Sequence, residues 1–341
     1  MAFLHHRKLY FANADYEEFT NFPVLIKIDD SAGDYPDLDA YNNISFHDSD
    51  GTKLSWGCKE FNAGGVSYYI VKCINIAKSD TNYIDVYYGG DTSTESKSGV
   101  CDANTVLLTD MVDYGDTSHV EDWTGVNTLT KVGAATPAEA SGYIGLCQDF
   151  NGTSDYITIA SNAAIDISGD YTLELYLRLD DLTGDQYIYN AGYNNNSSIL
   201  WYQSGTLMKV LERTAAGANN FYQSEPFNLS AEQWFTFSFK RATNVLSYFL
   251  NSTKGTDDNV AGVNTATNDH HIGWARPRDN ASTYTGGLIG LVRLSDTARS
   301  DNWLKAQDKI LRQQDYVTFG SQVDQIRAYH TKPTVVRIMG Q

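Results

Sequence analysis

The sequences GLCQDFNGTSDYITI, residues 145–159, and GGLIGLVRLSDTARSDNWLKAQ, residues 286–307, enclose a long region with a strand-like pattern. Within it, GDYTLELYLRLDD at 169–181 places leucine at every second position from Leu173 to Leu179. This alternation has the period of a β-strand with one buried face, whereas a helix would scatter the leucines around its surface. The region therefore predicts β-sheet.

A second alternating segment, QWFTFSFKRATNVLSYFLNSTKGT at 233–256, lies downstream. Phe235, Phe237 and Phe239 alternate with polar residues, and the alternation resumes after a turn at Thr243. Such rows of large apolar side chains are typical of a β-sandwich. We expect the leucine row and the phenylalanine row to face each other across its core.

Taken together, the four segments resemble the strands of a concanavalin A-like, laminin-G-type jelly roll. Residues 145–159 and 286–307 resemble its opening and closing strands, 169–181 resembles its central strand, and 233–256 resembles its hairpin. The resemblance implies a fold and not an activity, because this fold hosts both binding proteins and enzymes.

The first ninety residues carry a second set of strand-like segments: RKLYFANADYEEFTNFPVLIKID, NNISFHDSDGTKLSW, VSYYIVKCINI and YIDVYYGG. In this order they resemble the small all-β domain of unknown function that often precedes such a jelly roll in bacterial, archaeal and phage surface proteins. The usual opening Trp is absent, with Leu4 or His5 near its place, and Gly90 replaces the usual Asn.

The two resemblances imply an all-β chain of two β-sandwich domains, the second a concanavalin A-like (laminin-G-like) jelly roll, with one short C-terminal helix. We expect the small domain at residues 1–90, a polar linker at 91–104, the jelly roll at 105–320 and a tail at 321–341. The tail carries several apolar residues. It is expected either to act as an attachment or oligomerisation strand on a neighbouring subunit, or to close on its own domain.

A single helix is predicted at about 300–314. Ser300 or Asp301 would cap its N-terminus, and the cations Lys309 and Arg312 would lie in its last turns. The apolar residues of this segment fall along one side: Trp303, Ala306, Ile310 and Leu311.

The formal net charge is −17, from 25 basic and 42 acidic side chains. This balance argues against a nucleic-acid partner, because phosphate binding requires clustered Lys and Arg. No stretch approaches the ~20 apolar residues of a membrane helix, so membrane insertion is not expected.

The N-terminus MAFLHHRKLYF has too short an apolar run for a secretory signal. Most proteins with this two-domain layout are exported. A native start at Met1 would therefore point to the surface of a virion, and a removed signal would point to a secreted, extracellular protein.

Four cysteines, Cys58, Cys73, Cys101 and Cys147, show no CxxC spacing for zinc or redox chemistry. Cys58 and Cys73 lie on adjacent predicted strands, where a disulfide could form. For a protein folded in a reducing cytoplasm we expect buried free thiols instead.

Signatures of catalysis are absent from the sequence. There is no G-x-S-x-G, no H-E-x-x-H, no P-loop and no E-x-D-x-x-E run of the kind that jelly-roll glycanases carry. Glu174 has no second carboxylate at strand spacing and is expected on a solvated outer face. We therefore expect a protein that is not an enzyme and has no catalytic residues.

Metal sites are not predicted either. The adjacent pairs His5-His6 and His270-His271 would point to opposite faces of a strand. Calcium remains an unassigned candidate cofactor, because the oxygen donors in KGTDDN (Asp257, Asp258, Asn259) and in HDSDG (Asp48, Asp50) are too few. HDSDG is better explained by a hairpin turn.

The candidate ligand-binding residues are aromatic. Tyr193, Trp201, Tyr202 and Trp274 lie near the Asn-rich segment NAGYNNNSS at 190–198, and aromatic faces with amide groups are common in sugar sites. The alternative is that these and nearby aromatics (Tyr187, Tyr189, Tyr222) fill the sandwich.

Two functions follow from these observations. The first is a non-enzymatic virion surface protein, a phage capsid decoration or tail-fibre component that displays a lectin-like jelly roll. The second is a secreted or cell-surface carbohydrate-binding adhesin, and a glycoside hydrolase ranks last. The expected partners are other virion proteins, further copies of the chain as a homo-oligomer, and host-surface glycans.

Overall fold

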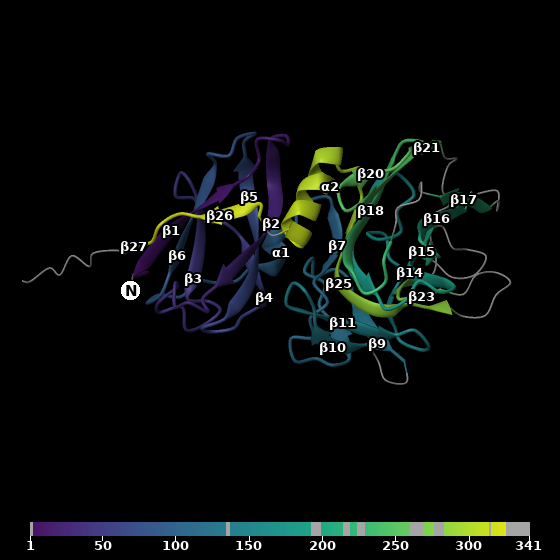
Figure 1. The fold of residues 1–341 in the computed structure, drawn as a ribbon, viewed down its shortest axis with the longest axis horizontal. Coiled ribbons are helices and arrows are strands. Elements are labelled where there is room, and N and C mark those ends of the chain that lie inside the picture. Colours follow the sequence, from purple (N-terminus) through teal and green to yellow (C-terminus); the bar gives the residue numbers. More distant parts are fainter. Residues whose placement is uncertain are drawn as a thin grey trace, which may run out of the picture.

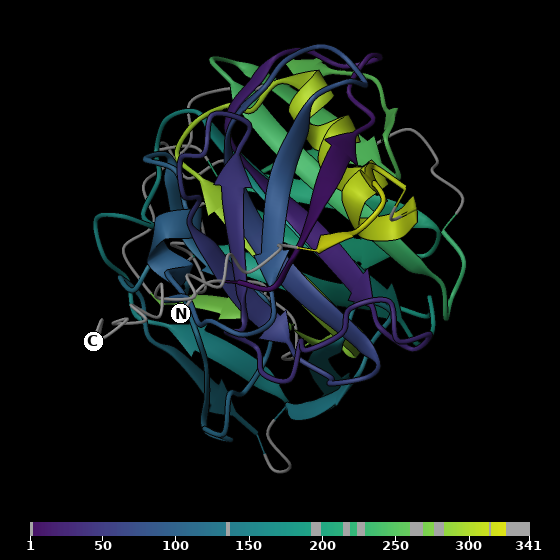
Figure 2. The ribbon, with the colours of Figure 1, turned by 90° about the vertical axis from the view of Figure 1, so that its left-hand side faces the viewer.

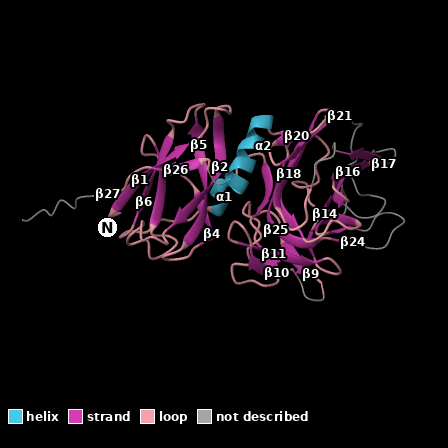
Figure 3. Cartoon of the chain, in the orientation of Figure 1, coloured by secondary structure: helices cyan, strands magenta, loops and turns pink. Residues whose placement is uncertain are grey.

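The computed structural model describes residues 3–133, 137–191, 199–213, 219–223, 229–259, 269–275, 283–313 and 315–324. Side chains are not described at 199–203, 211–213, 219–223 and 313. The fold is all-β, with two groups of sheets on either side of a helix (Figures 1 and 3).

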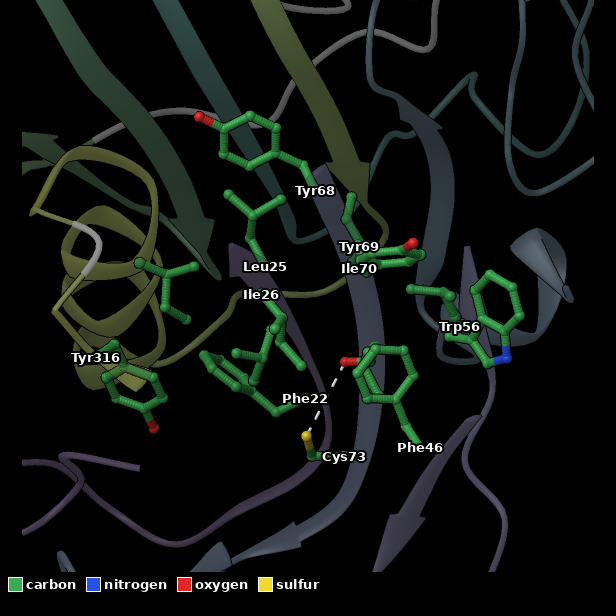
Figure 4. Packing of buried hydrophobic residues seen from close by; sticks show 14 of the residues in the cluster. Phe22, Leu25, Ile26, Phe46, Trp56, Tyr68, Tyr69, Ile70, Cys73 and Tyr316 are labelled. Carbon is green, nitrogen blue, oxygen red and sulfur yellow. Dashed lines mark hydrogen bonds between the residues drawn. The ribbon is translucent and has the colours of Figure 1, made fainter. Parts of the chain in front are cut away.

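Two sheets form the N-terminal domain. The first runs in the order β26-β1-β6-β3, with β27 also paired to β1, and the second runs β2-β5-β4. The elements are β1 (His5–Phe11), β2 (Phe19–Asp29), β3 (Ile44–Asp48), β4 (Trp56–Glu60), β5 (Val66–Ile76), β6 (Tyr83–Tyr88), β26 (Val317–Phe319) and β27 (Val323–Asp324). Between the sheets lies a buried core that includes Phe22, Phe46, Trp56 and Tyr69 (Figure 4).

The C-terminal strands of the chain belong to this first domain. Val317–Phe319 pairs with β1 through Leu9 and Phe319, and Val323–Asp324 pairs with β1 through His5 and Asp324. The sequence had placed β26 in the jelly roll and β27 in the tail. As far as the tail is described, up to Asp324, it pairs with the N-terminal domain, and the rest of the tail lies outside the described residues.

The segment expected as a linker is folded against the N-terminal domain. It contains the short helix α1 (Lys97–Val100), and Val100 is fully buried in the core of that domain. Gly99 has no room for a side chain, because an added Cβ would lie 2.6 Å from the Ser55 hydroxyl. The segment is held in place by the burial of Val100 and by the close approach of Gly99 to Ser55. The Gly/Ser-rich composition does not reveal either contact.

Two larger sheets form the jelly roll. One runs β10-β11-β25-β13-β18-β19-β20, with β7 on β25 and β21 on β19; the other runs β17-β16-β15-β14-β22-β12-β9-β8. Two short strands, β23 and β24, pair separately. The strands are β7 (Thr105–Thr109), β8 (His119–Val120), β9 (Leu129–Val132), β10 (Ala138–Ser141), β11 (Leu146–Asn151), β12 (Tyr156–Ile159), β13 (Tyr171–Leu179), β14 (Asp185–Ala191), β15 (Ile199–Ser204), β16 (Leu207–Arg213), β17 (Asn219–Gln223), β18 (Trp234–Ala242), β19 (Val245–Leu250), β20 (Thr253–Lys254), β21 (Asp258–Asn259), β22 (His270–Ile272), β23 (Trp274–Ala275), β24 (Thr283–Tyr284) and β25 (Gly286–Ser295).

The predicted leucine and phenylalanine rows form the core of the jelly roll, but they do not face each other. β13 and β18 are hydrogen-bonded neighbours, with Leu175 opposite Phe237, so both rows lie side by side on one face of one sheet. The expectation of facing rows was wrong, because register between segments far apart in sequence cannot be read from alternation. The opposite sheet contributes Ile157, Ile159, Ile188, Tyr189 and Ile272.

The predicted helix is confirmed as α2 (Asp301–Asp308), which continues as a π-helical turn over Lys309–Gln313. Ser300 is its N-cap, and its hydroxyl accepts a 3.0 Å hydrogen bond from the Trp303 backbone N–H. The helix lies between the two domains (Figure 1), and Trp303 packs edge-on against Phe22 at 4.6 Å. Viewed from the N-terminal domain, the strands of that domain lie in front of the jelly roll (Figure 2).

This arrangement corrects the expectation for Glu174. The side chain is 3% exposed and forms a bidentate ion pair with Arg293, with both N–O distances at 2.8 Å. The Arg293 guanidinium in turn lies 5.7 Å from the Trp303 ring of α2. Glu174 is therefore buried and paired on a covered face, and it is not a solvated surface charge.

All four cysteines are described, and all four are free. Cys58 lies opposite Tyr69 and Cys73 opposite Phe22, so the pair considered for a disulfide is not in cross-strand register. Burial raises the pKa of Cys58 to about 12 and that of Cys147 to about 11. The prediction of buried thiols is confirmed for Cys58, Cys73 and Cys147, and Cys101 is only partly buried.

Among the described residues, no helix is both long enough and apolar enough to cross a membrane.

Candidate functional site

The outer face of the second jelly-roll sheet carries a line of polar side chains. Strand pairing aligns Thr130 with Thr158, Thr158 with His271, and His271 with Asn190. Apolar neighbours along each of these strands, Leu129, Ile157, Tyr189 and Ile272, belong to the sandwich core. Since side chains alternate between the two faces of a sheet, the four polar residues point to the opposite face. We call Thr130, Thr158, His271 and Asn190 the polar row.

Two members of the polar row bury side-chain atoms that have no hydrogen-bond partner among the described residues. Asn190 is 1% exposed, and within the described structure neither its side-chain oxygen nor its nitrogen is hydrogen-bonded. His271 is 7% exposed, and its Nδ1 atom is likewise unpartnered. A buried polar group left in this state costs about 1–3 kcal/mol. Such a cost points to a ligand or ordered water that supplies the missing hydrogen bonds.

His271 is uncharged at neutral pH. Burial lowers the pKa of its imidazole to about 4, and the nearby Asp269 carboxylate only partly opposes this effect. The polar row thus presents two hydroxyls, one amide and one neutral imidazole. All of these groups can form hydrogen bonds, and none of them carries a charge at pH 7.

Three aromatic rings flank the polar row and form the aromatic platform: Tyr156, Trp274 and Tyr284. Tyr156 stacks on Trp274 with ring centroids 5.1 Å apart, and the centroids of Tyr156 and Tyr284 are 6.4 Å apart. The His271 ring lies 4.6 Å from Trp274, so the platform and the row are contiguous. All three platform rings are partly exposed.

Gly273 allows the aromatic platform and the polar row to lie side by side. Its φ of +84° is in the left-handed region, which favours glycine, and an added Cβ would lie 2.6 Å from the Phe150 ring. Gly273 separates β22 from β23 and donates its N–H to Ile188 O at 2.9 Å. The backbone can therefore turn between His271 and Trp274 and keep both side chains on the same site.

The structure brings one of the four sequence-predicted residues into this site, namely Trp274. Tyr193 lies outside the described residues. Trp201 and Tyr202 lie on β15 opposite Tyr189 and Tyr187, and their side chains, like that of Tyr222, are outside the described part. Tyr187 and Tyr189 are buried, and the Tyr189 hydroxyl contacts His270 Nδ1 at 3.0 Å.

The sequence reasoning missed most of the site. Asn190 was noted only as the start of an Asn-rich segment, and His271 was weighed only as a metal ligand. Tyr156 and Tyr284 were not singled out at all. The usable signal was the alternation of Ile157 and Ile159 with Tyr156 and Thr158, which assigns the latter pair to the outer face.

The histidine pairs separate onto opposite faces, as expected. His270 is fully buried, and its Nε2 lies 2.9 Å from Asp166, whereas His271 faces outward. His6 contacts Asp85 at 2.6 Å. Across the residues that the structure describes, no group of three or more His, Cys, Asp or Glu side chains could hold a metal ion.

The acidic segments weighed for calcium have other contacts. In HDSDG, Gly51 has a φ of +90°, and the Asp50 carboxylate accepts a 2.8 Å hydrogen bond from the Thr52 N–H, as in a hairpin turn. Asp257 pairs with Lys254 at 3.0 Å, and Asp258 accepts a hydrogen bond from the Tyr248 hydroxyl at 2.7 Å.

Comparison with protein families identifies the domain that carries the site. Residues 151–305 match the model of the concanavalin A-like lectin/glucanases superfamily. These residues form a concanavalin A-like domain. They include Thr158, His271, Asn190 and the whole aromatic platform, whereas Thr130 lies on a strand of the same sheet just before the match. No curated protein matches the chain at a significant level.

Several solved structures are similar to part of this chain. The binding domain of Paraclostridial Mosquitocidal Protein 1 matches with a TM-score of 0.50 and 11% identity, over 60% of this chain and 52% of that one. Domain 4 of the arabinanase AbnA from Geobacillus stearothermophilus, solved with arabinotriose, matches with a TM-score of 0.45 and 18% identity, over 60% and 98% of the chains. The botulinum neurotoxin serotype G binding domain gives a TM-score of 0.48 and 11% identity, over 61% and 51%. The chain thus spans about half of the first of these structures.

Proposed function

We propose that this chain is a non-enzymatic carbohydrate-binding protein whose glycan site is the outer face of the second jelly-roll sheet. The observation that carries the proposal is the pair of buried, unpartnered polar side chains, Asn190 and His271, beside the partly exposed aromatic platform. The concanavalin A-like fold of residues 151–305 is consistent with this function.

The chemistry of the site suits a sugar. A pyranose or furanose ring carries hydroxyls that both donate and accept hydrogen bonds, and its C–H face packs on aromatic rings. The Asn190 amide offers one acceptor and two donors, and His271 Nδ1 offers a further position. Trp274 and Tyr156 supply the stacking surface next to these groups.

We propose binding without hydrolysis. Glycoside hydrolysis requires two carboxylates at a defined separation across the scissile bond. The polar row supplies hydroxyl, amide and imidazole groups instead. Glu174, the acid considered from the sequence, is held by Arg293 on the other sheet.

Binding to a glycan array followed by calorimetry tests the proposal. Trp274→Ala should lower the affinity for the best array ligand at least tenfold. The variant loses the stacking contact between the sugar and the indole ring, together with part of the apolar surface that binding buries. The matched control is Tyr143→Ala, because Tyr143 is 52% exposed and lies in the turn between β10 and β11, which belong to the other jelly-roll sheet. Equal affinities of wild type and Trp274→Ala would refute the site.

We further propose that the protein is displayed on the surface of a virion, with secretion as the alternative. The resemblance of the two-domain layout to phage and prokaryotic surface proteins supports this proposal. Mass spectrometry of purified extracellular particles provides the test. Many copies per particle are expected, and absence from the particles would favour the secreted form.

A further inference from the structure

An open depression adjoins the aromatic platform at one end of the jelly roll. Its volume is about 420 Å³, and it is lined by the loops that follow β11 and β13, by β24, and by the first residues of β14 and β25. Its lining includes Asp181, Thr183, Asp185 and Tyr284. Most of this lining is polar, and the two carboxylates are exposed.

The depression and the glycan site share a residue. Tyr284 lines the depression, and its ring also belongs to the aromatic platform, 6.4 Å from the Tyr156 ring centroid. Tyr284 lies opposite Trp274 in the β23–β24 pair. A chain molecule bound on the platform would therefore continue into the depression over Tyr284, without a gap between the two surfaces.

The floor of the depression is held in place by hydrogen bonds. The Gln186 side chain donates to Asp181 O at 2.7 Å and accepts from the Gly286 N–H at 3.0 Å. The Asp181 carboxylate accepts from both the Thr183 N–H and the Thr183 hydroxyl at 2.8 Å. These bonds hold the loop between β13 and β14 and tie it to the start of β25, so its polar groups are arranged before any ligand arrives, which lowers the entropic cost of binding.

We propose that this depression is a second subsite of the same glycan site, and that the ligand is an uncharged oligosaccharide rather than a single sugar or an anionic glycan. The inference rests on the proposed function. Carboxylates such as Asp185 accept hydrogen bonds from sugar hydroxyls, and these charge-assisted bonds are stronger than neutral ones. The same carboxylates repel uronic acids, sialic acids and sulfated sugars, and the net charge of −17 adds to that repulsion.

The neutral polar row agrees with this class of ligand. Its four side chains carry no positive charge at pH 7 that would compensate an anionic sugar. A row built for anionic glycans would require Lys or Arg in hydrogen-bonding positions. We therefore expect the site to distinguish neutral oligosaccharides by the arrangement of their hydroxyl groups and by their chain length.

Calorimetry with neutral oligosaccharides of increasing length tests the second subsite. The probes are malto-, cello-, xylo- and arabino-oligosaccharides from mono- to hexasaccharide, with oligogalacturonides of the same lengths as the anionic series. Wild type should bind the longer members of at least one neutral series about tenfold or more tighter than the monosaccharide. It should bind the oligogalacturonides more weakly than every neutral series.

Asp185→Ala separates the two subsites. This variant should lose most of the gain with chain length, while its affinity for the monosaccharide or disaccharide stays unchanged. Glu18→Ala is the matched control, because it removes one exposed carboxylate from the N-terminal domain and should leave both affinities unchanged.

The outcomes are distinguishable. The second subsite would be overturned if affinity did not increase with oligosaccharide length, or if Asp185→Ala kept the same increase as wild type. Either result would leave the proposed function standing. Preferential binding of the oligogalacturonides would overturn the neutral class. Binding of no glycan, in this panel or on the array, would overturn the proposed function itself.

Discussion

Replacing Asn190 by leucine should make the protein more stable and weaken its glycan binding. The Asn190 side chain is 1% exposed, and neither of its polar atoms is hydrogen-bonded within the described structure. Its burial therefore costs about 1–3 kcal/mol that an apolar side chain of similar volume does not incur. We expect Asn190→Leu to raise the free energy of unfolding by about that amount.

The binding loss follows from the same atoms. A sugar that satisfies the Asn190 amide gains roughly one or two hydrogen bonds, each worth about 0.5–1.5 kcal/mol net. Losing them lowers the affinity by a factor of roughly 2 to 150. Differential scanning calorimetry measures the stability, with an increase of about 2–4 °C in melting temperature for each kcal/mol. Titration calorimetry measures the affinity.

Asn13→Leu is the matched control for this substitution. Asn13 is also fully buried, but its amide donates to the carbonyls of Glu17, Ile76 and Ala77, and its oxygen accepts from the Tyr316 hydroxyl at 2.8 Å. The same change there leaves these groups unpaired and should destabilise the protein by about 1–3 kcal/mol or more. An Asn190→Leu variant that is as destabilised as Asn13→Leu, or that binds as well as wild type, would refute the reasoning.

Three further predictions concern the His271 imidazole, the Glu174–Arg293 ion pair and the N-cap of α2. Because the folded-state pKa of His271 lies at about 4, below the ordinary value of 6.5, the unfolded chain binds the extra proton as pH falls. Stability should therefore decrease between about pH 6.5 and 4, by up to roughly 3 kcal/mol in total, and His271→Gln should remove this component in urea denaturation measured across that range. Glu174→Ala leaves Arg293 buried without its partner, so we expect the free energy of unfolding, measured with urea, to fall by about 3–5 kcal/mol. The double variant Glu174→Leu/Arg293→Met removes both charges and should recover much of this stability. A double variant as unstable as Glu174→Ala would contradict the prediction. Ser300→Ala removes the cap of α2 and the hydrogen bond that the Ser300 hydroxyl donates to Glu17, and it should cost about 1 kcal/mol, while Ser300→Thr, which keeps a hydroxyl for both contacts, should cost less in the same assay.

Local sequence patterns predicted the elements of this fold well. The alternation in 172–179 fixed a strand with one buried leucine face, and the Ser300 signal fixed the start of α2, because both depend on neighbouring residues alone. The family resemblance supplied the jelly roll, which residues 151–305 confirm. These inferences need no knowledge of which distant segments meet.

Predictions that depended on distant segments failed or could not be made. Glu174 has the pattern of an outward residue, yet Arg293 and the neighbouring α2 bury it, which no strand period reveals. The leucine and phenylalanine rows are neighbours because β13 pairs with β18. The polar row joins Thr130, Thr158, Asn190 and His271, which are far apart in sequence and meet only through the register of four strands. Trp274 was singled out from the sequence because an aromatic residue is conspicuous, whereas Asn190 and His271 become candidates only when the structure shows that their buried polar atoms lack partners among the described residues.

The most direct test of the central claim is an NMR titration that follows the side-chain amide of Asn190 and the imidazole of His271. The titrant is the neutral oligosaccharide that binds best on the array. The account predicts that both resonances shift in proportion to the fraction of protein bound, along with the ring signals of Trp274. Saturation of the protein with these signals unmoved, and shifts confined to other parts of the chain, would contradict a glycan site on this face of the jelly roll.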